Sequence, residues 1–325
     1  MDRRTFISVF AGGLVTAHSV AESQPAAKIH RVGILLGGTG EEAAPLLRAL
    51  ADGLSDLGYV DGRNLMFEGR YAGVRMERLP DLAAELVRLR VDVIVTGSNP
   101  YVAAAQRATA TIPIVIVASA DPVGAGFVAS LARPGGNVTG LTIDASPEMF
   151  AKNLSLLTEL VPRLSRVGVI RQADREVGGF AELETTARRL NVALDVVDIR
   201  SVDELAGAFA TMTGRRVGAV IIAGPVFYLR RQQVADLALK HRLPAIHVLK
   251  EYAEAGLLIT YGPNLVDLYR RAASYVAKIL SGVKPAELPI AQPAKFDLVI
   301  NLKTAKTLGL TVPQPMLLRA DEVIQ

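Results

Sequence analysis

The sequence VDVIVTGSNPYVAAAQRATATIPIVIVASADP, residues 91–122, decides how the chain can fold. Residues 91–96 are apolar and β-branched, as expected of a short strand that is buried on both faces of a sheet. Residues 101–109 are rich in alanine and predict a helix, and residues 113–117 predict a second buried strand. The stretch is therefore a β-α-β unit. Its strand ends carry polar loops to one edge of a parallel sheet, where open α/β sheets bind ligands.

The same order of elements occurs a second time. Residues 217–222 (VGAVII) predict a strand, residues 223–226 (AGPV) a loop, and residues 244–247 (PAIH) a second strand after a helical stretch. The opening strands of the two halves also match, since RVGIL at residues 31–35 resembles RVGVI at residues 166–170. This repeat predicts an α/β fold with two doubly wound parallel-sheet lobes whose loop edges face each other across a cleft.

The last third of the chain predicts elements that return to one lobe or the other. Residues 265–280 have the apolar periodicity of a long helix, residues 296–301 predict a late strand, and the tail from Pro315 is expected to be extended. If this helix packs on the first lobe and the tail on the second, three segments of the chain cross between the lobes. Several crossings favour a hinge over independent domains. The expected division is lobe 1, residues 31–141 plus 262–284, and lobe 2, residues 142–261 plus 285–325.

The N-terminus has the three regions of an export signal. Arg3 and Arg4 form a basic region, residues 5–17 are apolar but too short to span a bilayer, and small residues follow. We expect a signal peptide at residues 1–23, cleaved near Ser23 and Gln24, and a periplasmic protein. The paired arginines fit a twin-arginine signal, and a general secretory signal fits equally well.

Composition excludes several classes of function. The absence of cysteine excludes disulfides, thiolate metal sites, a catalytic thiol and a lipid-anchored terminus, so no membrane anchor is expected. A net charge of +4 without a dense basic block predicts no nucleic-acid partner. The sequence has no P-loop, HExxH or GxSxG motif, so we expect no enzyme and no cofactor, and any ATPase is a separate chain.

Several short motifs together resemble one family over the whole mature chain. They are MERLPDLA at residues 76–83, VDVIV at 91–95, TIPIV at 111–115, DPVG at 121–124, LARPGGNVTG at 131–140 and FDLVINLKTA at 296–305. With these motifs the chain resembles the TrpX-type ABC-transporter substrate-binding proteins, a branch of the type I periplasmic-binding fold. The resemblance implies two lobes that close on a small ligand, an amino acid or small carboxylate, and delivery to an inner-membrane permease with a separate ATPase. Aromatic amino acids are the namesake ligands of that family.

In lobe 1 the predicted ligand-binding residues come from loops at strand ends. They include Thr39 and Gly40 after the first strand and Ser98 and Asn99 after the third. Free amides at the helix start beside Ser98 suit a carboxylate, and Asp121 suits an ammonium group. Plain helix capping is an equal interpretation for Ser98, and for Asp121 a cap on a following short helix is the slightly stronger one.

In lobe 2 the candidates are Arg171 and Gln172, which follow a buried strand. The Arg171 guanidinium suits a bidentate pair with a ligand carboxylate, and a surface salt bridge is the alternative.

Aromatic residues outside the predicted helix cores form a further set of candidates. They are Tyr101, Phe227, Tyr228 and Tyr261, and Pro225 lies in the same loop as two of them. In a chain without tryptophan, this placement indicates an apolar cleft that packs an aromatic or branched ligand, although each aromatic alone is typical of ordinary packing.

The sequence leaves two alternatives open. GTGEEA at residues 38–43 matches the dinucleotide fingerprint G-x-G-x-x-A, with Glu68 as the ribose-binding acid. The acid is too far along the chain and Pro45 lies early in the helix, which disfavours an exported Rossmann-like enzyme. The other alternative is a ligand-sensing module that serves a membrane receptor.

Overall fold

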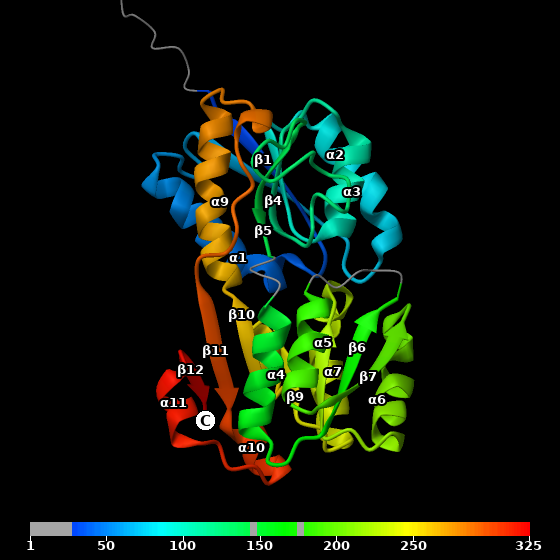
Figure 1. Cartoon of the computed structure of the whole chain (residues 1–325). Helices are drawn as coiled ribbons and strands as arrows, with labels where there is room; N and C mark the ends of the chain where they lie inside the picture. The colour runs from blue at the N-terminus through cyan, green and yellow to red at the C-terminus, as the bar shows by residue number, and fades with distance from the viewer. Residues whose placement is uncertain (1–27, 144–147, 174–178) are drawn as a thin grey trace, which may run out of the picture.

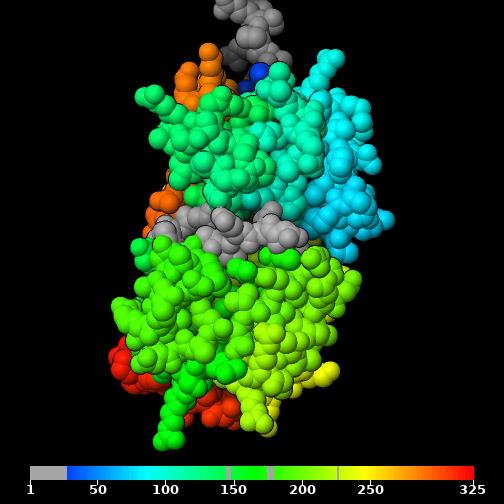
Figure 2. Space-filling model, turned by 45° about the vertical axis from the view of Figure 1, so that its right-hand side comes forward, coloured from blue at the N-terminus to red at the C-terminus, as the bar shows by residue number. Residues whose placement is uncertain are grey.

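A computed structural model describes residues 28–143, 148–173 and 179–325, which form two α/β lobes (Figure 1). Figure 2 shows the lobes one above the other, with the N-terminal half of the chain contributing most of the upper lobe. The predicted signal peptide, residues 1–23, lies outside the described residues. No helix in the described ranges is long and apolar enough to cross a membrane.

Lobe 1 is built on a five-stranded parallel sheet in the order β2-β1-β3-β4-β5. Ile94 and Ile116 point to the face covered by α2 and α3, whereas Val95 and Val117 point to the face covered by α1 and α9. The central strands are thus buried on both faces, as their apolar runs predicted. The elements are β1 (His30–Leu36), α1 (Gly40–Asp56), β2 (Leu65–Tyr71), η1 (Met76–Arg78), α2 (Leu79–Arg88), β3 (Val93–Thr96), α3 (Asn99–Ala108), β4 (Ile114–Ser119), β5 (Val138–Thr142), α9 (Leu265–Leu280) and η4 (Pro285–Glu287).

Lobe 2 is built on a seven-stranded sheet in the order β12-β11-β10-β9-β8-β6-β7. The predicted doubly wound fold is confirmed, with the same β-α-β order repeated. The elements are α4 (Met149–Leu160), β6 (Arg166–Gln172), α5 (Phe180–Arg189), β7 (Ala193–Ile199), η2 (Val202–Glu204), α6 (Leu205–Gly214), β8 (Ala219–Ala223), η3 (Pro225–Arg230), α7 (Arg231–Lys240), β9 (Ala245–His247), α8 (Glu251–Glu254), β10 (Ile259–Pro263), β11 (Phe296–Asn301), α10 (Leu302–Leu308), α11 (Gln314–Arg319) and β12 (Glu322–Ile324).

One strand pair departs from the expected parallel arrangement, because β11 runs antiparallel to β10. The chain leaves lobe 2 at the end of β10, forms α9 on lobe 1, and re-enters lobe 2 at the start of β11 (Figure 1). A strand that leaves toward the other lobe and the strand that returns from it must point in opposite directions when they are neighbours.

The expectation of an extended C-terminal tail is wrong for residues 315–319, which are helical. Pro315 lies in the first turn of α11, where its missing N–H removes no helical hydrogen bond. Met316 is fully buried against lobe 2, and β12 then adds an edge strand parallel to β11. The tail therefore completes lobe 2.

Three segments cross between the lobes, after β5, after β10 and before β11. The last crossing is held on lobe 1 by hydrogen bonds: the Thr139 hydroxyl donates to the Leu288 carbonyl at 2.6 Å, and the Ala291 N–H donates to the Gly140 carbonyl at 2.9 Å. We therefore propose that lobe 1 includes the chain as far as Ala291, rather than ending at residue 284, and that β10 belongs to lobe 2 through Pro263.

Candidate functional site

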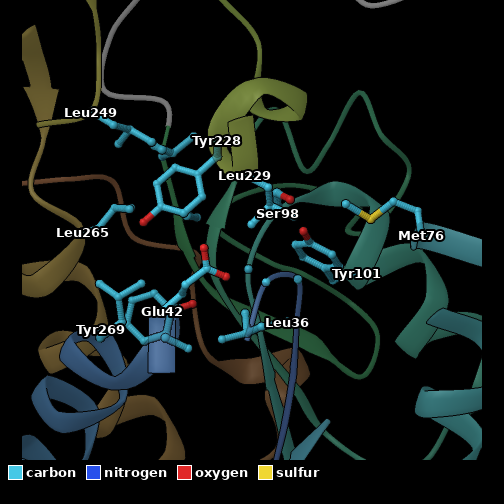
Figure 3. A pocket seen from close by; sticks show the side chains of 17 residues that line it. Leu36, Glu42, Met76, Ser98, Tyr101, Tyr228, Leu229, Leu249, Leu265 and Tyr269 are labelled. Atoms are coloured by element: carbon cyan, nitrogen blue, oxygen red, sulfur yellow. The ribbon is translucent and has the colours of Figure 1, made fainter. Parts of the chain in front are cut away.

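A pocket lies where the two lobes meet, at the carboxyl ends of β1, β3 and β4 (Figure 3). The space open to the centre of a water molecule is about 120 Å³, roughly ten times what one water occupies by that measure. Most of the described residues that line it are apolar or aromatic. They are Leu36, Gly37, Gly38, Glu42, Ala43, Leu46, Met76, Gly97, Ser98, Tyr101, Ala118, Ile143, Tyr228, Leu229, Leu249, Leu265 and Tyr269.

The lobe 1 wall depends on the close packing of Tyr101 over Gly37. The Tyr101 ring is nearly buried, and its hydroxyl hydrogen bonds with the Ser98 side chain and the Gly37 backbone. A Cβ at Gly37 would overlap that hydroxyl and would lie 3.1 Å from Leu229 of lobe 2. A side chain at position 37 would therefore displace the Tyr101 hydroxyl and press against Leu229 of the other lobe. Burial raises the pKa of Tyr101, so the phenol stays protonated at neutral pH.

Glu42 enters the pocket from the first turn of α1. Thr39 is the N-cap of this helix, and its hydroxyl accepts the Glu42 N–H at 3.2 Å. The Glu42 Oε2 accepts the Thr39 N–H at 2.9 Å, which completes a capping box. This hydrogen bond holds the carboxylate near Gly38, and Figure 3 shows it pointing into the cavity.

The lobe 2 wall comes from η3, which carries Tyr228 and Leu229. The loop before η3 is fixed by His247, which is buried at the end of β9. Burial lowers the pKa of His247 to about 3, so the ring is neutral. Its Nδ1 accepts the Leu249 N–H at 3.0 Å, and the ring also hydrogen bonds to the Gly224 backbone. His247 is therefore a structural residue that holds the loop on which Tyr228 is carried.

Behind Tyr228 lies a half-buried acidic residue, Glu251, whose Oε2 atom is buried. Its Oε2 atom has no hydrogen-bond partner among the described residues. Burial is the main cause that raises the pKa of Glu251 to about 7. Burial also raises the pKa of Tyr228, and the carboxylates of Glu251 and Glu42 add to this effect. The guanidinium of Arg231 lies 5.0 Å from the centre of the Tyr228 ring and acts in the opposite direction.

Of the residues predicted to bind ligand, the structure brings Ser98, Tyr101 and Tyr228 to the pocket. Thr39 and Gly40 lie next to it: Thr39 caps α1, and Gly40 packs against the ring of Tyr71. Ser98 makes no capping hydrogen bond through its side chain, although it is the N-cap of α3.

Asp121 and the residues after it differ from the sequence-based interpretation. The short helix expected after Asp121 does not form in residues 121–137, all of which the structure describes, and the segment is a series of turns. Asp121 adopts a left-handed backbone with φ +39°, and its Oδ1 accepts the Gly124 N–H at 2.9 Å. Asp121 is not among the described residues that line the pocket.

Asn99 is turned away from the pocket and ties α3 to the end of β4. Its side chain donates to the Ala120 carbonyl at 2.7 Å, and its Oδ1 accepts from the Ser119 hydroxyl and the Ala120 N–H, both at 2.9 Å. The residue is 8% exposed.

Replacing Asn99 with alanine is expected to lower the free energy of unfolding by about 2 kcal/mol, because two buried donors lose their acceptor. Urea denaturation followed by circular dichroism measures this change. Arg107→Ala, at an exposed position of the same helix, is the control and should change stability by less than about 0.5 kcal/mol. Equal stability of the two variants would contradict the structural role of Asn99.

Arg171 was predicted to meet the ligand carboxylate from lobe 2, and the structure places it elsewhere. Arg171 pairs with Asp198 at 2.5 Å, and its guanidinium lies 4.8 Å from the centre of the Phe180 ring. This arrangement matches the alternative of a surface salt bridge. Gln172, Phe227 and Tyr261 are not among the described residues that line the pocket either.

The positions of these residues follow from their strands and loops. Gln172 ends β6. Pro225 begins η3, and its side chain lies outside the described part of the structure. Phe227 is fully buried in the core, so the side chain that reaches the cavity is the next one, Tyr228. Tyr261 stacks on Phe296, with ring centres 6.1 Å apart.

The dinucleotide alternative does not suit this geometry. In that fingerprint a pyrophosphate lies over the glycines at the helix start. Here the negatively charged Glu42 lies over Gly38 and takes up the Thr39 N–H. A carboxylate at this position would repel a phosphate.

Sequence reasoning missed Glu42, Leu229, Leu249, Leu265 and Tyr269 as pocket residues. Leu265 and Tyr269 lie four residues apart on α9, so both were assigned to the helix core. Their position in the first turns of the helix, directly after a predicted crossing between the lobes, would have indicated that they lie near the boundary between the lobes.

Comparisons with known proteins agree with this architecture. Residues 43–324 match the family model described as ABC transporter substrate binding protein. A tyrosine-binding protein of Clostridioides difficile is 27% identical over 260 residues, 79% of this chain and 74% of that protein. A Streptococcus pneumoniae ABC domain in complex with L-Trp has a TM-score of 0.82 at 23% identity, covering 91% of this chain and all of that one.

A conserved domain protein of Vibrio cholerae is similar to the same degree, with a TM-score of 0.81 and 26% identity over 91% of this chain and all of that one. The match of the family model extends from α1 in lobe 1 to β12, the last strand of lobe 2. The resemblance noted from the sequence motifs is thereby confirmed, and the chain belongs to the family of ABC transporter substrate-binding proteins.

Proposed function

We propose that this protein captures an apolar α-amino acid, aromatic or branched, between its two lobes in the periplasm and delivers it to the permease of an ABC importer. The observation that carries the proposal is the pocket itself, because both lobes supply its walls and tyrosines and leucines make up much of its lining. Relatives named for tyrosine binding and seen with L-Trp support an aromatic ligand.

Binding in this pocket couples directly to closure of the hinge. A ligand that touches Tyr101 of lobe 1 and Tyr228 of lobe 2 is fully surrounded only when the lobes are together. Its differential affinity for the closed state shifts the population toward that state. The N-terminus of α3, beside Ser98, offers the partial positive charge of the helix to a ligand carboxylate.

We propose binding without chemical transformation of the ligand. The pKa values of Tyr101, Tyr228 and Tyr269 are all raised, mainly by burial, so these phenols do not act as bases at neutral pH. They serve as apolar walls with hydrogen-bonding tips.

A thermal-shift screen against amino acids, aromatic carboxylates, sugars and nucleotides tests the proposal. An apolar amino acid at 100 times its dissociation constant should stabilise the protein by about 2.7 kcal/mol. Leu229→Asp, which places a charge in the pocket wall, should abolish the shift, whereas Leu318→Asp, at a 78% exposed position, should leave it unchanged. A shift with nucleotides or sugars alone would contradict the proposal.

Uptake of the radiolabelled ligand in cells lacking the protein tests the transport role. Loss of uptake is the expected result. If the purified protein binds the amino acid but cells that lack the protein still take it up normally, the result would instead support a sensing module.

A further inference from the structure

Charged side chains are nearly absent from the described lining of the pocket. Among the described residues that line it, Glu42 is the only one with a charged side chain. The rest of that lining consists of apolar, glycine, serine and tyrosine residues. An ionic group of a ligand enclosed there needs a partner of opposite charge, because an unpaired charge away from water is costly.

The carboxylate of Glu42 lies opposite a polar atom of the other lobe. Figure 3 shows Glu42 extending from α1 toward the hydroxyl end of Tyr228. The two groups interact electrostatically, since the Glu42 charge contributes to the raised pKa of Tyr228. Within the described chain the Tyr228 hydroxyl makes no hydrogen bond with another residue, so its oxygen is available to accept one.

We propose that Glu42 of lobe 1 and Tyr228 of lobe 2 hold the protonated amine of the ligand between them, so that the site selects apolar ligands with an amine and rejects the matching carboxylic acids. This inference rests on the proposed function above and narrows its ligand class. The ammonium donates to the Glu42 carboxylate and to the Tyr228 oxygen, and these two hydrogen bonds join the lobes. An acid without the amine would instead bring a second negative charge to Glu42.

The capping role of Glu42 can be separated from this role in recognition. A glutamine at the same position also completes a capping box, since its side-chain oxygen accepts the Thr39 N–H. Glu42→Gln therefore removes the charge and leaves the helix cap in place. Glu41 precedes it in the same first turn, is exposed as Glu42 is, and does not line the pocket, so Glu41→Gln is a matched control.

The experiment is calorimetric titration of the wild-type protein with two sets of ligands that share a side chain. One set is L-tyrosine, tyramine and 3-(4-hydroxyphenyl)propionate, and the other is L-leucine, isoamylamine and 4-methylpentanoate. In the set whose amino acid binds, we expect the amine to bind measurably. The acid should bind at least about 100-fold more weakly than the amino acid.

Three variants are then titrated with the same amino acid. Glu42→Gln should weaken binding by about 30-fold or more, because the ammonium loses its partner of opposite charge, and Tyr228→Phe by about 5-fold, because the ammonium loses an acceptor that carries no charge. Glu41→Gln should stay within about 2-fold of the wild type. The melting temperature of Glu42→Gln is compared with that of Glu41→Gln to show that both are folded.

An acid that binds as tightly as its amino acid would overturn the assignment of the amine while leaving the proposed function standing. Unchanged affinity in a folded Glu42→Gln variant would do the same. If Glu42→Gln does not fold, the wild-type comparison of amine with acid still decides. A wild-type protein that binds none of the six compounds contradicts the proposed function as well.

Discussion

Replacing Gly140 with alanine is expected to lower the free energy of unfolding by about 3–5 kcal/mol, because backbone strain and steric overlap act together. Gly140 lies in the middle of β5 at φ +129°, a conformation that residues with a side chain rarely adopt. Its Cβ would overlap the carbonyl oxygen of Ile116 and lie 2.8 Å from the Ile116 nitrogen. Both atoms belong to the backbone of β4, so relief requires the two strands to separate.

The position matters beyond lobe 1, because the Gly140 carbonyl accepts the Ala291 N–H of the third crossing. Gly207→Ala is the matched control: this glycine lies inside α6, and a Cβ added there would meet no described atom within 4 Å. Alanine there should stabilise the protein by about 0.5–1 kcal/mol. Urea denaturation of both variants gives the comparison, and equal midpoints would contradict the close approach of β5 to β4.

Replacing Glu251 with glutamine is expected to change how stability depends on pH. The pKa of Glu251 is about 7 in the folded protein against 4.5 for an unperturbed glutamate, and burial is the main cause. Between these values the folded state binds more protons than the unfolded state. The free energy of unfolding of the wild type therefore falls as the pH rises through this window.

The size of the loss is about 3 kcal/mol between pH 4.5 and pH 8, and Glu251→Gln should not show it. The charged groups that act on Glu251 are Glu254, Lys250 and Arg231, and their individual contributions are smaller than that of burial. The difference in the free energy of unfolding between Glu251→Gln and the wild type should therefore shift in favour of the variant as the pH rises above 4.5.

Urea denaturation of both proteins at several pH values measures the difference. Glu77→Gln, at an exposed position in η1, is the control and should follow the wild-type profile. Parallel profiles for Glu251→Gln and the wild type would show that the Glu251 carboxylate is not held protonated by its surroundings.

Much of the fold could be predicted because a buried parallel strand is a local feature of the sequence. Residues 93–96 are all buried, and the apolar run alone predicts this because both faces of the strand are covered by helices. The repeated β-α-β order then indicates two lobes. The direction of β11 was missed because it depends on where α9 lies, which is a tertiary relation.

The site was harder to predict, as neighbouring residues show. Ser98 lines the pocket, whereas Asn99 turns inward to hold Ala120. Phe227 is in the core, whereas Tyr228 faces the cavity. The side-chain cap considered for Ser98 does not form. That these residues lie in loops at strand ends could be predicted, but a loop's composition does not specify which side chain points into the cavity.

The sequence by itself determined the alternation of strands and helices, the family to which the chain belongs and the presence of two lobes with crossings between them. The alternation and the lobes depend on short-range hydrogen bonding and on the periodicity of burial, whereas the family follows from the resemblance of the short motifs. Only the tertiary structure decided that Glu42 of α1 lies opposite Tyr228 of η3. The two residues are far apart in the chain and belong to different lobes, so their approach depends on how the lobes pack, with Leu229 of lobe 2 beside Gly37 of lobe 1.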